Sequence, residues 1–561
     1  MSYSQQLIGA FVSALIALPL GLAFGVASGL GAEAGVLSAV IAGFIAALWS
    51  GTAGQHSGPT GAVSVLLALS VAHFTQAIPN NPEAAIMLTF AVVVLAGAIQ
   101  MLFGWLKWGR FIEYLPHSVI SGLLSAIGIM LILEQLPAIL GGENWVYPLE
   151  VIMALPSMLS APSWPELILG CATILFMLIW PKHFPRLNRY LPAPIMVLVM
   201  GVIIVSLLSH QHLLAVNGVW WMGDFRVIGE LSFHMPSLHL PSLEVWQLPY
   251  LVQTAFTLAV VASLVSLLGS VVTEKMTRQT HDPNKELMGQ GLSNMASGLF
   301  GGMASTGAPM RTTVAMSYGS RSSWAAAVHA LMVGLLAFSV QDFFAHVPLA
   351  VLGGLLIKVG LDQIDWSYLK RWRAIPKAGK SMMLAVLATA ILLDLVSAVV
   401  VGLAMASFVL FGRMTQLQLN ALHLGRNTVE LPGIWFTEAE KTLLDKAQNQ
   451  LVIAYLDVPM SFGAARGLSR RVLKTEGMAY LLDFRSVPYI DFSSAMVLDD
   501  LIYRLQSRGA KVWLLLALGD AQDQLSRQGV LNKLEGRTGF NREVSMQQAL
   551  DFIEETNTKE Q

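Results

Sequence analysis

The chain has 561 residues, of which 55% are hydrophobic and only 12% are charged, and its formal net charge is −1. This composition excludes a protein that is soluble over most of its length and predicts a polytopic membrane protein. The charge balance, without a basic cluster, gives no indication of a nucleic-acid partner. The single cysteine, Cys171, excludes an internal disulfide and a cysteine-based metal cluster.

Fourteen apolar stretches are long enough to span or half-span a bilayer. They cover residues 8–30, 34–50, 59–74, 85–106, 111–139, 165–181, 192–209, 247–273, 288–303, 309–318, 322–340, 347–361, 380–394 and 395–412. The first basic residue is Lys107. Residues 1–30 therefore lack the positive segment of a cleavable signal peptide, and we expect them to be a retained first span.

The basic residues between these stretches predict their orientation, because Lys and Arg gather in cytoplasmic loops. The connections 4–5, 6–7, 8–9 and 12–13 contain Lys107, Arg110, Lys182, Arg186, Arg189, Lys275, Arg278, Lys285, Lys370, Arg371, Arg373, Lys377 and Lys380. The connections of opposite parity, around 75–84, 140–164 and 210–246, contain Arg226 alone. We therefore expect a multi-pass protein of the inner (plasma) membrane with both termini in the cytoplasm. The loop 210–246 suits either an extracytoplasmic cover at the membrane interface or a connection without a role of its own.

Two proline-containing breaks interrupt the apolar pattern, one at Ser57-Gly58-Pro59-Thr60-Gly61 and one at residues 305–313 (Ser-Thr-Gly-Ala-Pro-Met-Arg-Thr-Thr). Their prolines lie 250 positions apart, which suggests a repeated half. Each break ends one apolar segment and begins another, so each starts a short half-helix whose unpaired N–H groups point into the protein. Paired interruptions in matching positions of two halves predict a transporter's binding site. Two positive helix ends that face each other favour an anion.

A change of composition near residue 413 predicts a second domain. Residues 1–412 contain 17 of the 34 Lys and Arg, and the much shorter remainder contains the other 17. In this remainder, apolar runs at 451–456, 478–483 and 511–516 alternate with amphipathic stretches at 463–474, 494–508 and 519–528. This pattern indicates a small α/β domain whose strands are buried under helices. The expected division is a transmembrane domain over 1–412, a linker over 413–435 and a cytoplasmic domain over 436–556.

Several motifs together resemble the sulfate permease (SulP) family of anion transporters over nearly the whole chain, and within it the BicA-type bicarbonate transporters. They are residues 17–29 (Ala-Leu-Pro-Leu-Gly-Leu-Ala-Phe-Gly-Val-Ala-Ser-Gly), 58–61 (Gly-Pro-Thr-Gly), 284–292 with 297–302, and 364–371. The tail resembles the STAS domain of such transporters, with residues 487–494 at the turn where related anti-sigma factor antagonists are phosphorylated. The resemblance implies fourteen spans in two inverted seven-span repeats, which form a core domain and a gate domain. It also implies a homodimer with an elevator-like step and a substrate held between half-helices 3 and 10.

The resemblance also implies the residues of the substrate site. They are Phe24, Pro59, Thr60, Gly61, Val265, Ala308, Pro309, Met310, Arg311 and Thr312. The alternative is that the breaks are ordinary helix kinks and that Arg311 extends to the membrane interface. Whether Ser64, Ser305 and Thr312 bind the anion or their own helix backbone is open.

Three positions depart from the family pattern. Leu20 stands where many relatives have a glutamine, which leaves Phe24 as the aromatic wall. Val265 stands where BicA-type proteins have a sodium-binding aspartate, so the familiar sodium site is weakened. Arg311 stands where the bicarbonate transporters have a small residue, and a fixed cation here can replace the charge that sodium supplies elsewhere.

Three further residues carry weaker signals. Asp394 suits a proton relay or a structural hydrogen bond, and we favour the structural bond. We interpret His329 as a packing residue whose hydrogen bonds are satisfied. Ser493 aligns with the phosphorylatable serine of the STAS antagonists and is a candidate regulatory residue, so a STAS-binding regulatory protein is a candidate partner.

The sequence contains no nucleophile–base pair, phosphate loop or metal-ligand spacing, so we predict neither an enzyme nor a cofactor. We expect a secondary transporter of small inorganic anions, with bicarbonate ahead of sulfate. One alternative is a sodium-independent exchanger or proton-coupled carrier of sulfate, chloride or a dicarboxylate. The other, from a different class, is a channel-like or signalling membrane protein with a STAS output.

Overall fold

The computed structural model describes residues 3–110, 116–142, 147–188, 191–210, 225–229, 248–393 and 395–560. Asp394 and most of the loop 210–246, for which the sequence suggested roles, lie outside these residues. The chain divides into two compact units, Met1–Ala406 and Ser407–Gln561.

Each of the fourteen apolar stretches predicted from the sequence contains one helix in the described part of the chain. Seven of the described helices are long and apolar enough to cross a bilayer, and four shorter apolar helices accompany them. The prediction of a polytopic helical membrane protein is confirmed, while the number of crossings stays a prediction.

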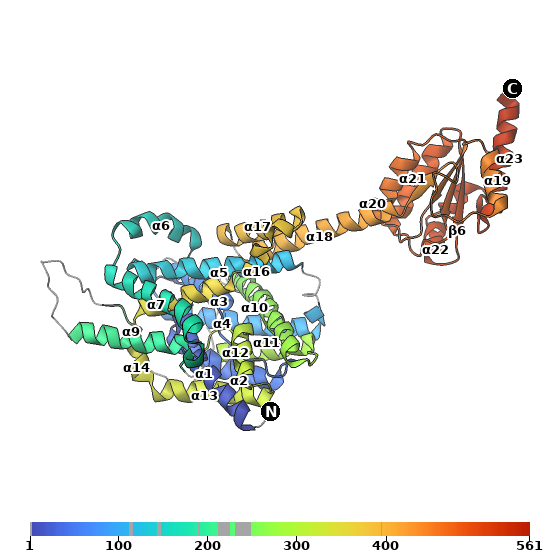
Figure 1. Ribbon diagram of the computed structural model, residues 1–561. Helices are drawn as coiled ribbons and strands as arrows, with labels where there is room; N and C mark the ends of the chain where they lie inside the picture. Colours follow the sequence, from blue (N-terminus) through green and yellow to red (C-terminus); the bar gives the residue numbers. More distant parts are fainter. Residues whose placement is uncertain are drawn as a thin grey trace. The chain divides into compact units, whose positions relative to one another are not determined.

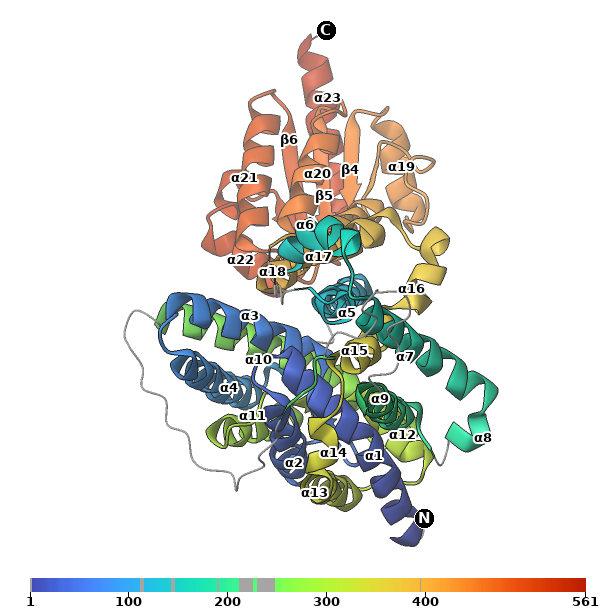
Figure 2. The same ribbon diagram turned by 90° about the vertical axis from the view of Figure 1, so that its left-hand side faces the viewer.

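The helices of the N-terminal unit form two bundles, each built from segments far apart in the sequence. In the first bundle α11 packs against α4 and α2, and α13 packs against α1 and α2, as Figures 1 and 2 show. Its members are α1 (Tyr3–Ala27), α2 (Ala32–Trp49), α3 (Gly61–Ala77), α4 (Pro82–Trp105), α10 (Leu248–Thr277), α11 (Pro283–Leu299), α12 (Pro309–Ser317) and α13 (Ser323–Ser339).

In the second bundle α15 packs against α5 and α7, and α17 packs against α5. Its members are α5 (His117–Leu140), α6 (Pro148–Ser160), α7 (Trp164–His183), α9 (Ala193–His210), α15 (Leu349–Gln363) and α17 (Lys377–Leu392). The bundles meet where α3 contacts α5 and where α1 contacts α9 and α15. The short helices α8 (Pro185–Asn188), α14 (Gln341–Ala345) and α16 (Trp366–Lys370) lie in connections.

Glycine pairs allow the closest helix crossings in both bundles. A Cβ atom at Gly97 of α4 would lie 2.6 Å from the carbonyl oxygen of Gly291 on α11. In the second bundle a Cβ atom at Gly128 of α5 would lie 2.5 Å from the carbonyl oxygen of Gly360 on α15. Small residues at such crossings let backbones approach where burial from water gives no driving force.

The connection 140–164, which the sequence predicted to be a loop, contains α6. Its 13 residues span roughly 20 Å, which is shorter than the bilayer's apolar core of about 30 Å. The helix packs against α5 and α17. Short apolar stretches with prolines, as here, are not told apart from loops by periodicity alone.

The C-terminal unit is a five-stranded sheet in the order β3-β4-β5-β6-β7, in which β3 is antiparallel to β4 and the other neighbours are parallel. The strands are β3 (His423–Gly425), β4 (Leu451–Tyr455), β5 (Ala479–Phe484), β6 (Lys511–Leu516) and β7 (Thr538–Gly539). The helices are α19 (Glu438–Lys446), α20 (Phe462–Val472), α21 (Phe492–Gln506), α22 (Asp520–Arg527) and α23 (Arg542–Glu560). The three predicted strands and three predicted helices are each present within two residues of their expected bounds.

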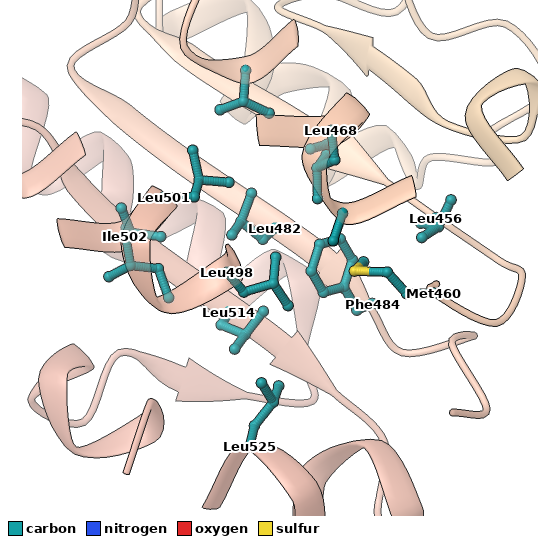
Figure 3. Close-up of a cluster of buried hydrophobic side chains, with 14 of the residues drawn as sticks. Leu456, Met460, Leu468, Leu482, Phe484, Leu498, Leu501, Ile502, Leu514 and Leu525 are labelled. Atoms are coloured by element: carbon teal, nitrogen blue, oxygen red, sulfur yellow. The ribbon is translucent and has the colours of Figure 1, made fainter. Parts of the chain in front are cut away.

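Each face of this sheet has its own apolar core. Tyr480, Leu482 and Phe484 of β5 pack with Leu468 of α20 and Leu501 of α21. Figure 3 draws part of this cluster and labels Leu482, Phe484, Leu468 and Leu501. The alternate residues of the same strand, Ala479 and Leu481, pack on the other face with residues of α19 and α23. Burial on both faces explains why the central strands are apolar except at Asp483 and Lys511.

The edges of this domain differ in detail from the sequence expectation. Helix α18 (Leu395–Asn420) runs without interruption through the expected boundary at residue 413. The strand β3 lies inside the expected linker 413–435 and pairs with β4. Three-residue strands carry too little pattern to be recognised from the sequence alone.

Candidate functional site

The two breaks lie side by side as a two-stranded antiparallel ribbon. Ser57 pairs with Gly307 and Gly58 pairs with Thr306, so β1 (Ser57–Gly58) and β2 (Thr306–Gly307) join segments about 250 residues apart. The hydroxyl oxygens of Thr60 and Thr306 lie 3.0 Å apart. The Ala308 N–H donates to the His56 carbonyl at 2.9 Å, which fixes the start of the second half-helix against the first break.

A half-helix begins directly after each strand of the ribbon. Helix α3 follows its N-cap residue Thr60, and α12 follows its N-cap residue Ala308. Neither N-cap side chain accepts a hydrogen bond from the first turn of its helix. The first-turn N–H groups of both helices therefore keep the partial positive charge that attracts an anion.

Arg311 of α12 is buried at the ribbon, with only 4% of its surface exposed. Its Nη1 donates to the Ser57 carbonyl at 3.3 Å and its Nη2 to the Pro59 carbonyl at 3.1 Å. Its Nε–H has no partner among the described residues. The side chain therefore does not extend to the membrane interface: it crosses from one half-helix to the break that starts the other and keeps free donors there.

Gly58 makes this position of the arginine possible. A Cβ atom at Gly58 would overlap Nη1 of Arg311, so any larger residue forces the guanidinium to move. The close approach of side chain to backbone, rather than an unusual φ, is what requires glycine here.

Apolar side chains lie around the start of α3. A Cβ atom at Gly61 would lie 3.0 Å from Leu131 Cδ2 and 3.6 Å from Phe24 Cε1. Phe24 comes from α1 of the first bundle, and Leu131 comes from α5 of the second. Leu131 was not identified from the sequence, because one leucine in an apolar span carries no distinguishing signal.

Val265 of α10 is buried and lines an apolar cavity. The other walls come from α10, α5, α17 and α18: Val119, Ile120, Leu123, Leu124, Leu264, Leu268, Val386 and Val399. Its neighbour Ser266 accepts a hydrogen bond from the Gly307 N–H at 3.1 Å. Val265 thus lies between the bundles, one residue from a direct contact with the ribbon.

Polar side chains hold the ribbon from behind. Gln55 donates to the Ser266 carbonyl at 3.1 Å and accepts from the Ser270 hydroxyl at 2.9 Å. On α11, Gln290 donates to the Ser57 hydroxyl at 2.7 Å and to Glu286 at 2.9 Å. On the helices, the signal for such residues was a polar pair at i and i+4, Ser266 with Ser270 and Glu286 with Gln290.

The sequence left open whether the hydroxyl groups of Ser64, Ser305 and Thr312 bind the anion or their own helix backbone, and the structure gives each of them a different environment. Ser64 donates to the Phe24 carbonyl at 3.1 Å, on a helix other than its own. Thr312 accepts from the His56 N–H at 3.0 Å. The Ser305 hydroxyl is buried without a partner among the described residues, so it is free to bind a ligand.

The predicted site residues thus come together from both halves of the first bundle, with Val265 at the edge. The backbone of Met310 belongs to α12, but its side chain lies outside the described part of the chain. The described part of the chain contains no group of three or more His, Cys, Asp or Glu residues that could hold a metal ion.

Ser493, the candidate regulatory residue, is exposed in the first turn of α21. The N-cap residue of this helix is Asp491, whose carboxylate accepts from the Ser494 N–H at 2.6 Å. A phosphate group would be favoured by the helix N-terminus and opposed by this carboxylate. Phosphorylation stays a prediction.

Comparison with known proteins gives one family. The model of the sulfate permease family matches residues 4–388. The chain is similar to the bicarbonate transporter BicA of Synechocystis sp., with 34% identity over 526 residues that cover 93% of this chain and 89% of the relative. It is 25% identical over 497 residues to the putative sulfate transporter YvdB of Bacillus subtilis, covering 87% of this chain and 86% of that protein.

Two solved structures agree with this result. The transmembrane domain of a cyanobacterial BicA has a TM-score of 0.63 and 36% identity, and the match covers 70% of this chain and 97% of that one. SLC26A9 has a TM-score of 0.77 over all of this chain and 91% of its own, at 19% identity, which is a likeness of fold alone.

Proposed function

The chain belongs to the sulfate permease family, and on this premise we propose that it is a secondary active transporter of small inorganic anions, with bicarbonate and sulfate as the leading substrates. Its relatives are transporters and not enzymes. Bicarbonate leads because the BicA relatives are the more similar of the proteins compared.

The observation that carries the proposal is the antiparallel pairing of the two breaks with Arg311 buried between them. Two helix N-termini and one fixed guanidinium make a region of positive potential inside an apolar bundle. A monovalent anion about 4 Å from the guanidinium gains about 4 kcal/mol at an effective dielectric constant of 20. The substrate-binding residues of this proposal are the ten predicted from the sequence.

An elevator-type movement is the proposed mechanism. The site belongs mainly to the first bundle, while Leu131 and the cavity wall opposite Val265 belong to the second. The cavity between the bundles is lined by apolar side chains, and such a surface favours sliding because it has no polar partners to exchange. The first bundle is then the moving core and the second the gate, and the fourteen proposed spans form two inverted repeats of seven.

We further propose that transport does not require sodium. Sodium prefers oxygen ligands and negative charge, and Val265 offers neither. Arg311 already balances the charge of the anion, and it repels a second cation near the ribbon.

The cellular setting of the proposal is the inner (plasma) membrane, with both termini cytoplasmic and the chain acting as a homodimer. The C-terminal sheet domain is proposed to be a STAS domain that binds a regulatory protein. Support comes from the distribution of basic residues in the loops and from the parallel sheet covered by helices on both faces.

Uptake into proteoliposomes tests the proposal. The purified full chain should show saturable uptake and counterflow of labelled bicarbonate or sulfate, with chloride and fumarate as competitors in the same panel. Flux that does not saturate and shows no counterflow would instead support the channel-like or signalling alternative.

A further inference from the structure

Two buried histidines lie directly behind the ribbon. His56, from the segment before β1, and His329, from α13, are each 1% exposed. Their ring centroids are 4.5 Å apart, and the rings meet edge to face at 76°. The backbone of His56 is bound to the second half-helix through Thr312 and Ala308. The pair therefore touches both breaks of the anion site.

The two imidazoles share one hydroxyl group. Ser13 Oγ of α1 lies 2.8 Å from His329 Nδ1 and 3.4 Å from His56 Nδ1. The other nitrogen of His56, Nε2, lies 3.0 Å from Ser320 Oγ. The other nitrogen of His329 has no partner among the described residues.

The nitrogen of His329 without a partner, Nε2, is the atom that could bind a proton, which a histidine that serves only for packing would not need. The Ser13 hydroxyl can donate to His329 Nδ1 or accept from it, whereas the Ala10 carbonyl, 3.3 Å from Nδ1, can only accept and favours the tautomer with the proton on Nδ1. In that tautomer the buried lone pair of Nε2 has no hydrogen-bond partner among the described residues. The sequence interpretation of His329 as a residue whose hydrogen bonds are satisfied was wrong at Nε2. The periodicity of a sequence does not reveal which side-chain atoms form hydrogen bonds.

We propose that the His56–His329 pair is a proton site that is loaded together with the anion, so that the proton is the co-transported ion. This rests on the proposed anion transport. The proton comes from water on the side of uptake, binds the Nε2 lone pair of His329 to give an imidazolium, and leaves with the anion on the other side. The Ser13 hydroxyl and the ring of His56 lie next to the charged ring.

The charges around the pair explain why proton and anion travel together. The helices packed against α13 are α1, which carries Tyr3, and α2, which carries Glu33; the backbone of His56 is bound to α12, which carries Arg311. Arg311 is buried, and so is Glu286 of α11, which is linked to Ser57 of the ribbon through Gln290. A second cation beside Arg311 is unfavourable when the site is empty, and a bound anion reverses this. By reciprocity, a proton on the pair strengthens anion binding by the same factor.

The first experiment follows proton movement during anion uptake. The full chain is placed in proteoliposomes that contain a pH-sensitive dye, without sodium, and an inward gradient of sulfate is applied. Sulfate is chosen because it keeps its charge over the range of about pH 5 to 8 in which histidine titrates. If only bicarbonate is transported, labelled bicarbonate is used and the signal of protein-free vesicles is subtracted. We expect the lumen to acidify, and anion affinity to rise up to about tenfold for each pH unit of acidification.

Two variants test the assignment to these residues. His329→Asn keeps a group at the position of Nδ1 and removes Nε2, and His56→Gln keeps a group that reaches Ser320. We expect both to retain anion counterflow and to lose at least about nine-tenths of the anion-driven proton flux, since one proton site is removed. His183→Gln, on the exposed end of α7, is the matched control and should behave as the parent.

The outcomes separate the two proposals. Saturable sulfate or bicarbonate uptake without proton movement in the parent protein overturns the proton site and leaves anion transport standing. Absence of saturable uptake for every anion overturns the proposed function itself. Unchanged proton flux in either variant overturns the role of the pair. If one variant does not fold, the other variant and the pH dependence of the parent decide.

Discussion

Replacing Arg311 with alanine should weaken anion binding strongly while the ribbon itself persists. The substitution removes the buried cationic side chain that crosses between the two half-helices. The strands keep their own backbone pairing and the hydroxyl contact between Thr60 and Thr306. The loss should therefore appear in affinity before it appears in folding.

The expected loss of anion affinity follows from the hydrogen-bond donors of the Arg311 guanidinium that are not used within the protein. Arg311 uses two of its N–H groups on the Ser57 and Pro59 carbonyls, and its Nε–H has no partner among the described residues. A hydrogen bond to a charged group contributes about 1.5 to 3 kcal/mol, which is about 10- to 150-fold in affinity. Binding of labelled anion to the purified protein, or the concentration dependence of counterflow, measures this change.

Arg321→Ala is the matched control, because Arg321 is an exposed arginine ten residues farther along the chain. It should leave affinity unchanged, whereas Arg311→Lys should recover part of it, since a lysine keeps the charge but not the planar donors. Equal affinity in the Arg311→Ala protein and the parent would refute the reasoning. The arginine would then serve only to join the breaks.

Three further predictions follow from the same structure. Gly58→Ala should lower anion affinity about as much as Arg311→Ala, because the added methyl displaces the guanidinium, while Gly412→Ala, which meets no atom within 4 Å, should not; competition binding checks both. Uptake should persist when sodium is replaced by potassium or choline at fixed pH, and a fall to background would reveal a sodium site. In the C-terminal domain, burial alone would raise the pKa of Glu440, but hydrogen bonds and charge from Arg542 hold that pKa below its usual value. This contribution to stability is complete above the unfolded pKa of about 4.3 and is lost as pH falls through the lower folded pKa. The amide hydrogens of β5 should therefore exchange faster in Glu440→Gln than in the parent at neutral pH. The difference between the two proteins should be smaller in acid.

The sequence predicted the elements of this fold well where apolar length or alternation was long. The central strands of the C-terminal sheet were recognisable because both of their faces are buried, so all of their residues except Asp483 and Lys511 are apolar. The edge strands β3 and β7 were missed because three and two residues carry no period. The helix α18 ran past the predicted boundary because charge composition changes before the helix ends.

The site could be predicted in its backbone but not in its side-chain contacts. Proline, glycine and hydroxyl residues at matching positions predicted the two helix starts that the ribbon brings together. The sequence did not reveal that Arg311 reaches the carbonyls of the other break, or that Gly58 makes room for it. Such contacts join residues about 250 positions apart and depend on tertiary packing. Leu131 and the orphan nitrogen of His329 were missed for the same reason.

The fixed charge of Arg311 links the questions of substrate and coupling ion. In the proposed site the cation is part of the chain, so the empty site is positive and a second cation is favoured only together with an anion. A proton on a neutral imidazole meets this condition better than sodium, because it needs no cage of oxygen ligands and the pair already lies behind the ribbon. In these two proposals the apolar side chain of Val265 and the burial of His56 and His329 beside the breaks are parts of one arrangement.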